Sequence, residues 1–142
     1  MSKRAGFTLV EIMIVVSIIV LLAAIAIPGI LRSRLSANEA GAVASLKTIS
    51  WAATTYRTQN PVYPVNLADL ASSVPAYVDS VLGSGLKQGY QFNLTGSANN
   101  FNVTAVPITQ NITGVRSFYV DAGGVIRASS NGTADATSSP IQ

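Results

Sequence analysis

One carboxylate lies at the start of the most apolar stretch of the sequence. Glu11 is followed by a run from Ile12 to Ile27 in which Ser17 is the only polar residue. A charge at the centre of a bilayer costs roughly 2.5–3.5 kcal/mol on insertion scales. In apolar surroundings such a charge is tolerated best when an opposite charge pairs with it. We therefore expect that the charge of Glu11 is either tolerated for a specific reason or paired with an opposite charge.

The residue types that support catalysis are scarce in this chain of 142 residues. It contains no His and no Cys, so the commonest general base and any thiolate metal site are excluded. No nucleophile–base pair or phosphate-binding loop is visible, and we predict a non-enzyme with no catalytic, cofactor or metal site. The late carboxylates Asp121 and Asp135 are too few to indicate calcium, and Asp121 is better explained as a turn residue.

The net charge of +3 comes from 9 basic and 6 acidic residues. Lys3 and Arg4 lie at the extreme N-terminus, and after Arg34 the basic residues are scattered singly. A nucleic-acid-binding domain needs a basic face. We therefore predict no specific nucleic-acid partner.

The elements that position Glu11 begin with a long helix. Residues 1–6 form a short basic segment, and residues 7–31 are apolar over more than the roughly 20 residues that span a bilayer. Pro28 and Gly29 interrupt this run. Proline removes a helical hydrogen bond and glycine loosens the backbone, so we expect a helix break there, as a kink or a locally unwound turn.

Residues 32–60 continue the helix with an amphipathic pattern. Apolar positions recur at helical spacing, which indicates a face that packs on the chain's own core. They are Leu35, Ala42, Ile49 and Tyr56, with Leu46 and Ala53 following at four-residue offsets and Glu39 as the exception in the stripe. The helix should end near Asn60, because Pro61 disfavours helical geometry before it.

Residues 61–142 are predicted to form a globular head. A short helix is expected at Leu67–Ser72. The stretches YQFNLTG, NFNVTAVP and SFYVDAGGVIRAS then alternate apolar and polar residues about turn signals. The predicted fold class is α+β: a long N-terminal helix, membrane-spanning in its first half and amphipathic in its second, packed on a small antiparallel sheet of three or four strands. From Ser129 onward the chain is expected to be loose.

Two hypotheses compete for the N-terminus. A secretory signal peptide has a basic start, an apolar run and a small-residue cleavage site, which Ala24-Ile25-Ala26 would supply. That hypothesis implies a secreted or signal-anchored binding module. It explains neither the charge of Glu11 nor the glycine at position 6.

The stretch GFTLVEIMIVV, followed by a long apolar helix, resembles the N-terminal signature of type IV pilins and pseudopilins. The resemblance implies that a prepilin peptidase cuts between Gly6 and Phe7 and that the new amine of Phe7 is methylated. It also implies that Glu11 of an incoming subunit pairs with the Phe7 amine of a neighbour, and that the helix melts at Pro28 on assembly. Many pilins close a C-terminal loop with a disulfide; because this chain has no Cys, we expect that loop to be absent or held in another way.

The function implied by the resemblance is that of a structural subunit of a type IV pilus, with a pseudopilin of a type II secretion system as the alternative. The implied partners are other copies of the chain in a helical homopolymer, the prepilin peptidase, the inner-membrane assembly machinery and, before assembly, membrane lipid. The implied location is the inner membrane before assembly and a cell-surface pilus afterwards.

Overall fold

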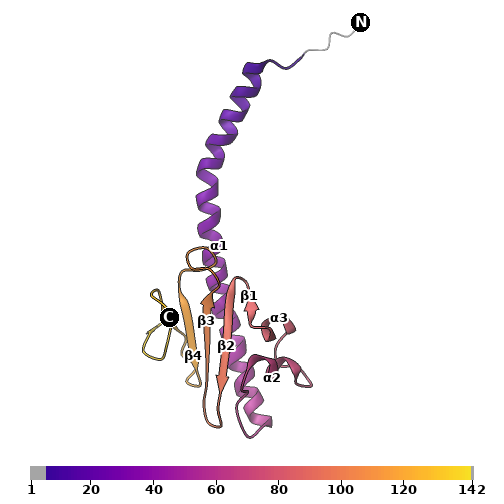
Figure 1. Ribbon diagram of the computed structural model, residues 1–142, viewed down its shortest axis with the longest axis vertical. Helices are drawn as coiled ribbons and strands as arrows, with labels where there is room; N and C mark the ends of the chain where they lie inside the picture. The colour runs from indigo at the N-terminus through magenta and orange to yellow at the C-terminus, as the bar shows by residue number, and fades with distance from the viewer. Residues whose placement is uncertain (1–5, 142) are drawn as a thin grey trace. The chain divides into compact units, whose positions relative to one another are not determined.

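The computed structural model describes residues 6–141 (Figure 1). The chain divides into two compact units, Met1–Arg34 and Leu35–Gln142, and helix α1, Leu9–Gln59, contributes to both. Residues 1–5 of the expected leader lie outside the described residues.

In the first unit, α1 is a continuous helix whose residues are exposed, apart from the partly buried Ala23. The hydroxyl of Ser17 donates to the Met13 carbonyl at 2.7 Å, so the one polar side chain of the apolar run is satisfied within its own helix. The helix continues through Pro28 and Gly29, so the chain is not unwound there in this structure, and the kink expected as the alternative stays a prediction. Proline removes one backbone hydrogen bond, and the remaining bonds on either side maintain the helix.

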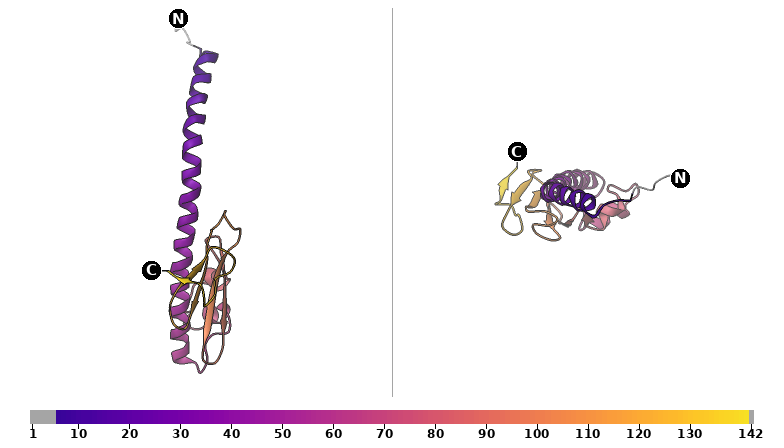
Figure 2. Two further views of the ribbon diagram at one scale, coloured as in Figure 1. Left: turned by 90° about the vertical axis from the view of Figure 1, so that its left-hand side faces the viewer. Right: turned by 90° about the horizontal axis from the view of Figure 1, so that it is seen from above.

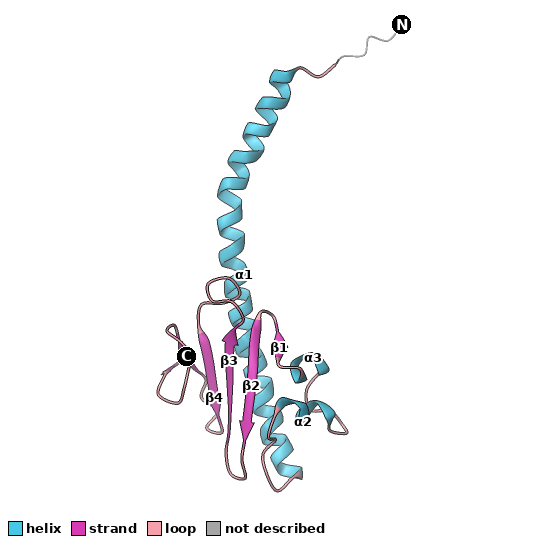
Figure 3. Cartoon of the chain, viewed as in Figure 1, coloured by secondary structure: helices cyan, strands magenta, loops and turns pink. Residues whose placement is uncertain are grey.

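The second unit combines the end of α1 with two short helices and an antiparallel sheet (Figure 3). Helices α2 and α3 are Leu67–Ser72 and Ser80–Gly83. The strands, in both sequence and sheet order, are β1 Leu86–Lys87, β2 Tyr90–Gly96, β3 Phe101–Pro107, β4 Ser117–Asp121, β5 Arg127–Ser129 and β6 Ser139–Pro140. The α+β class and α2 are confirmed, as is the end of α1.

The sheet has six strands within residues 6–141 rather than the three or four predicted. The two missed strands, β1 and β6, are edge strands of two residues each, too short to show alternation. β1 is joined to β2 by Gln88 and Gly89, which both have positive φ (49° and 75°), as a type I′ hairpin turn requires. β6 contains Pro140, which an edge strand tolerates because one side of it needs no ladder hydrogen bond. The segment expected to be loose therefore contributes a strand.

The core of the second unit lies between α1 and one face of the sheet (Figure 2). Ala42, Leu46, Ile49 and Ala53 are at most 1% exposed, which confirms the predicted stripe. The strands supply the other side of the core with alternating residues: Tyr90, Phe92 and Leu94 from β2, Phe101, Val103 and Ala105 from β3, and Phe118 and Val120 from β4. The opposite faces of β2 and β3 carry the intervening, mainly polar residues.

Glu39, the exception in the apolar stripe, binds the loop between β3 and β4. Its carboxylate accepts hydrogen bonds from the backbone N–H groups of Val115 and Arg116 at 3.0 and 3.1 Å. The Arg116 guanidinium adds a hydrogen bond of 2.9 Å and an ion-pair contact of 2.8 Å. Asn38 donates to the Thr113 carbonyl in the same loop. Helix and loop are thus joined by polar bonds at one end of the apolar stripe.

Candidate functional site

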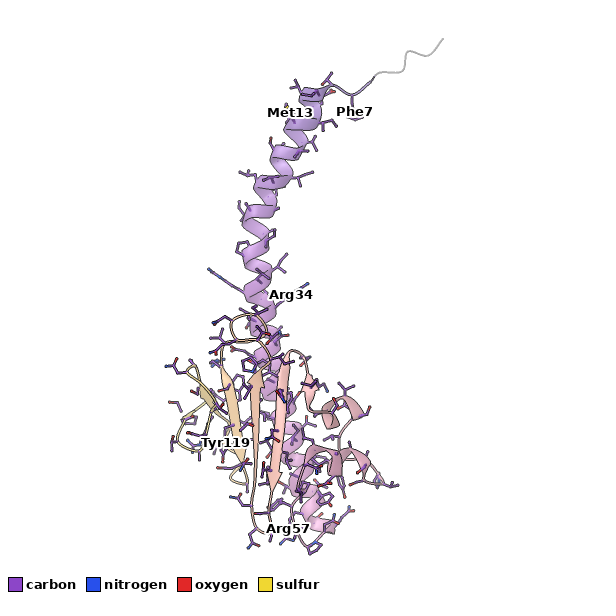
Figure 4. The ribbon with its side chains drawn as sticks, viewed as in Figure 1. Phe7, Met13, Arg34, Arg57 and Tyr119 are labelled. Atoms are coloured by element: carbon purple, nitrogen blue, oxygen red, sulfur yellow. The ribbon has the colours of Figure 1, made fainter. Side chains whose placement is uncertain are left out.

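The expected cleavage site lies just before the first turn of α1. Gly6, Phe7 and Thr8 have no helical structure, and the Phe7 side chain is 84% exposed (Figure 4). A Cβ added at Gly6 would meet no heavy atom within 4 Å in the part of the chain that the structure describes. A larger side chain at position 6 would therefore clash with no described residue. The Gly6–Phe7 peptide bond is accessible.

Thr8 and Glu11 form a reciprocal cap at the start of α1. The Thr8 hydroxyl accepts a hydrogen bond from the Glu11 N–H at 3.2 Å. Glu11 Oε2 in turn accepts from the N–H and the hydroxyl of Thr8, both at 2.8 Å. This is a capping box, which satisfies N–H groups that the first turn of a helix leaves without partners. The pattern Thr-x-x-Glu in TLVE signals it, and the sequence analysis missed both the pattern and the part played by Thr8.

The cap uses only one of the two carboxylate oxygens of Glu11. Oε1 accepts no hydrogen bond from any described residue, and the side chain is exposed. A carboxylate offers about four lone-pair sites, so a second donor can approach without disrupting the cap. The arrangement is chemically suited to pairing with a cation from outside the chain.

The apolar segment that follows Glu11 has no cover within the first unit. Its large apolar side chains, from Ile12 to Leu31, are 50–75% exposed. Among the described residues, α1 is the one helix long and apolar enough to cross a membrane, and none of its most apolar window is buried. A core helix of a soluble protein would be buried. The apolar side chains of this segment therefore require apolar surroundings that the first unit does not supply.

Pro28 and Gly29 lie within the same helix, away from the capping box. A Cβ added at Gly29 would meet no heavy atom within 4 Å among the described residues. Glycine in a helix interior costs roughly 0.5–1 kcal/mol relative to alanine. Packing within the described chain does not explain why this glycine is present.

The late carboxylates are each used within their own turn. Asp121 accepts from the Gly123 N–H at 2.9 Å, while its carbonyl accepts from the Gly124 N–H, which confirms it as a turn residue. Asp135 accepts from the backbone and hydroxyl of Thr137 at 2.8 and 2.7 Å. These bonds to the Thr137 side chain and backbone lower the pKa of Asp135. In residues 6–141 no three possible metal-ligating side chains come together.

Comparison with known proteins identifies the N-terminal pattern and the relatives that share it. Residues 1–27 match the family described as the prokaryotic N-terminal methylation motif. The type IV wide pilus major component PilA4 of Thermus thermophilus is 36% identical over 94 residues, which are 63% of this chain and 72% of that protein. The chain belongs to the type IV pilin and pseudopilin family. This is a family of structural subunits rather than enzymes.

Two secretion proteins of the same family are also similar to this chain, but the match covers a smaller part of each of them. The type II secretion system core protein G of Vibrio cholerae is 38% identical over 64 residues, 45% of this chain and 44% of that protein. The protein of the same name from Escherichia coli is 34% identical over 90 residues, 63% of this chain and 62% of that protein. The chain thus matches less than two thirds of the length of these two relatives.

Proposed function

We propose that this chain is a structural subunit of a type IV pilus, which polymerises through its apolar N-terminal helix after cleavage between Gly6 and Phe7. One observation carries the proposal: an apolar helical segment without cover follows directly after an accessible Gly6–Phe7 bond. A surface of this kind is stable when lipid or other apolar helices surround it. A membrane pool of subunits and a filament of packed helices supply these two environments in turn.

Processing is the first proposed step. A prepilin peptidase cleaves the Gly6–Phe7 bond on the cytoplasmic side of the inner membrane, and the new amine of Phe7 is methylated. The match of residues 1–27 to the methylation motif supports this step. The non-helical backbone before Leu9 supports it as well, since that bond can enter an active site without unwinding of α1.

Assembly is the second proposed step. The cleaved Phe7 ammonium of one subunit pairs with the Glu11 carboxylate of the next subunit to be added, at the oxygen that the Thr8 cap leaves available. In an apolar bundle, either charge alone carries a large desolvation cost, so the pairing sets the register of the two helices as well as attracting them. Melting of α1 at Pro28 and Gly29 during assembly belongs to the same proposal, and the unexplained glycine supports it.

A pilus is preferred to a secretion pseudopilus on two grounds. The match to the pilus component covers 72% of that relative, against 44% and 62% for the two secretion proteins. The outward face of β2 is polar, with Gln91, Asn93 and Thr95 all exposed, which suits a surface displayed along a fibre. A pseudopilin of a type II secretion system is the second candidate. The 38% identity to the Vibrio cholerae protein favours it.

Mass spectrometry of the mature N-terminus tests the processing step. We expect a chain that begins with methylated Phe7. Replacing Gly6 with a bulky residue should leave an uncut precursor in the membrane, because the fold has room for that side chain while the peptidase requires a small one. Normal-length protein from the Gly6 variant, or a mature chain beginning near Ile27, would favour a secreted or signal-anchored binding module instead.

A further inference from the structure

The β3–β4 loop, residues 108–116, displays two large apolar side chains to solvent. Ile108 is 56% exposed and Ile112 is 70% exposed. The only charged residue of this loop is Arg116, and its guanidinium is paired with the Glu39 carboxylate at 2.8 Å. The loop is therefore an apolar surface that carries no unpaired charge.

The backbone of the β3–β4 loop is hydrogen-bonded within the chain. The Thr113 N–H donates to the Thr109 carbonyl at 2.9 Å, and the Asn111 N–H donates to the Gly114 carbonyl at 2.8 Å. Across the loop, the N–H groups with such a partner are those of Ile108, Thr109, Asn111, Ile112, Thr113, Val115 and Arg116. A backbone donor that leaves water must keep a partner, because an apolar environment supplies none. The loop can therefore leave water without breaking these hydrogen bonds.

Helix α1 holds the β3–β4 loop at the end of the sheet to which β3 points (Figure 3). The Asn38 side chain donates to the Thr113 carbonyl at 2.9 Å, and Glu39 accepts from the Val115 N–H at 3.0 Å. Asn38 lies only seven residues after Leu31, where the apolar segment ends. Such a stretch spans about 10 Å as a helix and at most about 25 Å when fully extended. This tether keeps the loop near the end of the apolar segment whatever the angle between the two units.

Two exposed arginines, Arg32 and Arg34, close the first unit. Neither of them forms an ion pair with any described residue. Basic side chains at the end of a membrane-spanning helix extend to the lipid headgroups, where their charge stays hydrated. These arginines therefore indicate that the membrane–water boundary lies shortly before the residues of α1 that bind the loop.

We propose that the β3–β4 loop inserts Ile108 and Ile112 into the surface of the lipid bilayer while the subunit remains in the membrane before assembly. This inference rests on the proposed function, because that function supplies the membrane anchor. The apolar side chains leave water at the interface, and the pairing of Arg116 avoids an unmatched charge there. Because Asn38 and Glu39 bind the loop to α1, the contact orients the second unit against the bilayer. A lipid surface is favoured over a protein partner because the tether brings lipid to the loop of every subunit.

Spin labels at single cysteines test the lipid contact, since the chain has no cysteine of its own. We would reconstitute the full chain in vesicles of phosphatidylethanolamine and phosphatidylglycerol, with a nitroxide attached to Ile112→Cys. Oxygen concentrates in lipid and a chelated nickel complex stays in water, so the relaxation of the label by each of them reports its surroundings. We expect a several-fold lower collision rate with the nickel complex at Ile112→Cys than at Val74→Cys.

Val74→Cys is the matched control, because Val74 is also a large apolar residue of the second unit and is 98% exposed. Its segment is bonded to the other end of α1, where the Tyr77 hydroxyl donates to Gln59 Oε1 at 2.8 Å. Gln59 lies about 30 Å along the helix from Asn38, at 1.5 Å per residue. A label at Val74→Cys should therefore stay in water. A label at Ile18→Cys, within the apolar segment, should lie in lipid.

A charge placed in the loop supplies an independent measurement. In a chain labelled at Ile108→Cys, Ile112→Glu should raise the collision rate with the nickel complex several-fold, because burial of a carboxylate in lipid is costly. Ile112→Leu keeps the side chain apolar and should leave the rate unchanged. Both variants should fold, since Ile112 is 70% exposed, and circular dichroism checks this. An unchanged rate with Ile112→Glu would contradict the insertion.

The controls separate this inference from the proposed function. If the Ile18→Cys label lies in lipid while the labels at Ile112→Cys and Val74→Cys are equally accessible to the nickel complex, the lipid contact is overturned and the pilus proposal stands. Protection of the loop label in filaments but not in vesicles would assign the loop to a protein contact and would overturn the lipid contact as well. An Ile18→Cys label that stays in water would contradict membrane insertion, and with it the proposed function.

Discussion

The two halves of helix α1 differ in what surrounds their apolar side chains. From Leu9 to Leu31 the large apolar side chains are at least 50% exposed, whereas Ala42, Leu46, Ile49 and Ala53 are at most 1% exposed. Both halves have the same backbone conformation, so helix geometry does not distinguish them. The second half completes a core within its own unit, and the first half requires an environment that this chain alone does not supply. One end of the helix therefore serves folding, and in the proposed function the other end serves assembly.

The largest effect should come from removing the charge in the first half. Glu11→Ala should abolish filaments, because the Phe7 ammonium of a neighbour would be buried without a partner. Cleavage and membrane insertion should survive, since the substitution makes the segment more apolar. Electron microscopy of cells that express only this variant, with the mature mass measured alongside, checks both statements.

A matched pair of variants separates ion pairing from helix capping at Glu11. Glu11→Gln removes the charge but keeps a residue that can complete the capping box, whereas Thr8→Val removes the cap but keeps the charge. Loss of filaments with Glu11→Gln and their retention with Thr8→Val would assign the effect to the charge. The reverse pattern would mean that Glu11 acts only as a cap. Abundant normal filaments from Glu11→Ala would remove any assembly function for the carboxylate.

Truncation should separate the two halves physically. A chain that begins at Arg32 should be a soluble monomer at low concentration and should keep its sheet, because the buried stripe that covers the sheet is retained. Circular dichroism and size-exclusion chromatography measure these properties. Aggregation, or loss of the β signal, would contradict the independence of the second unit.

Within the second half of α1, the stability lost when a side chain is truncated should depend on how deeply that side chain is buried rather than on its size. In the truncated chain, Ile49→Ala should lower the free energy of unfolding by about 2–5 kcal/mol, because it leaves a cavity at a fully buried position. Trp51→Ala removes a larger side chain two residues away, but that side chain is 69% exposed. It should change the free energy of unfolding by no more than about 0.5 kcal/mol. Urea denaturation compares the two, and equal losses would contradict the conclusion that stability depends on burial at these positions.

A smaller effect than that of Ile49→Ala should come from Glu39, which joins the second half of α1 to the β3–β4 loop. Partial burial by itself would raise the pKa of Glu39, but the hydrogen bonds from Arg116 and Val115 and the Arg116 charge lower its pKa overall. A carboxyl with a lowered folded pKa contributes stability above its unfolded pKa of about 4.5 and loses that contribution as the pH falls below it. Acid should therefore weaken this contact.

Glu39→Gln tests the pH dependence. At neutral pH it should cost about 1 kcal/mol, the difference between hydrogen bonds to charged and neutral groups. Its stability should then fall less steeply than that of the unsubstituted head as the pH drops below 4.5. Asp135→Asn is the control, because the lowered pKa of Asp135 contributes to the same acid limb without touching α1. An unchanged slope with Glu39→Gln would mean that the contact does not depend on ionisation.

Local patterns were sufficient to predict most elements. Helical spacing predicted the buried stripe, Pro61 predicted the end of α1, and alternation predicted β2, β3 and β4. These signals succeed because one face of each element is buried along several residues. β1 and β6 were missed because two residues carry no periodicity, and their pairing depends on the strand already beside them.

For the candidate site, residue types and their spacing were enough to predict the cleavage position, and they give the charge of Glu11 and the apolar character of the segment after it. These properties belong to residue types and their spacing. The partners of Glu39 could be found from the folded chain alone, because Val115 and Arg116 are more than 70 residues away along the sequence. The structure also decided that Trp51 is exposed while Ile49 is buried. Both residues are large and apolar, and the direction in which the sheet packs against α1 determines which of them the core covers.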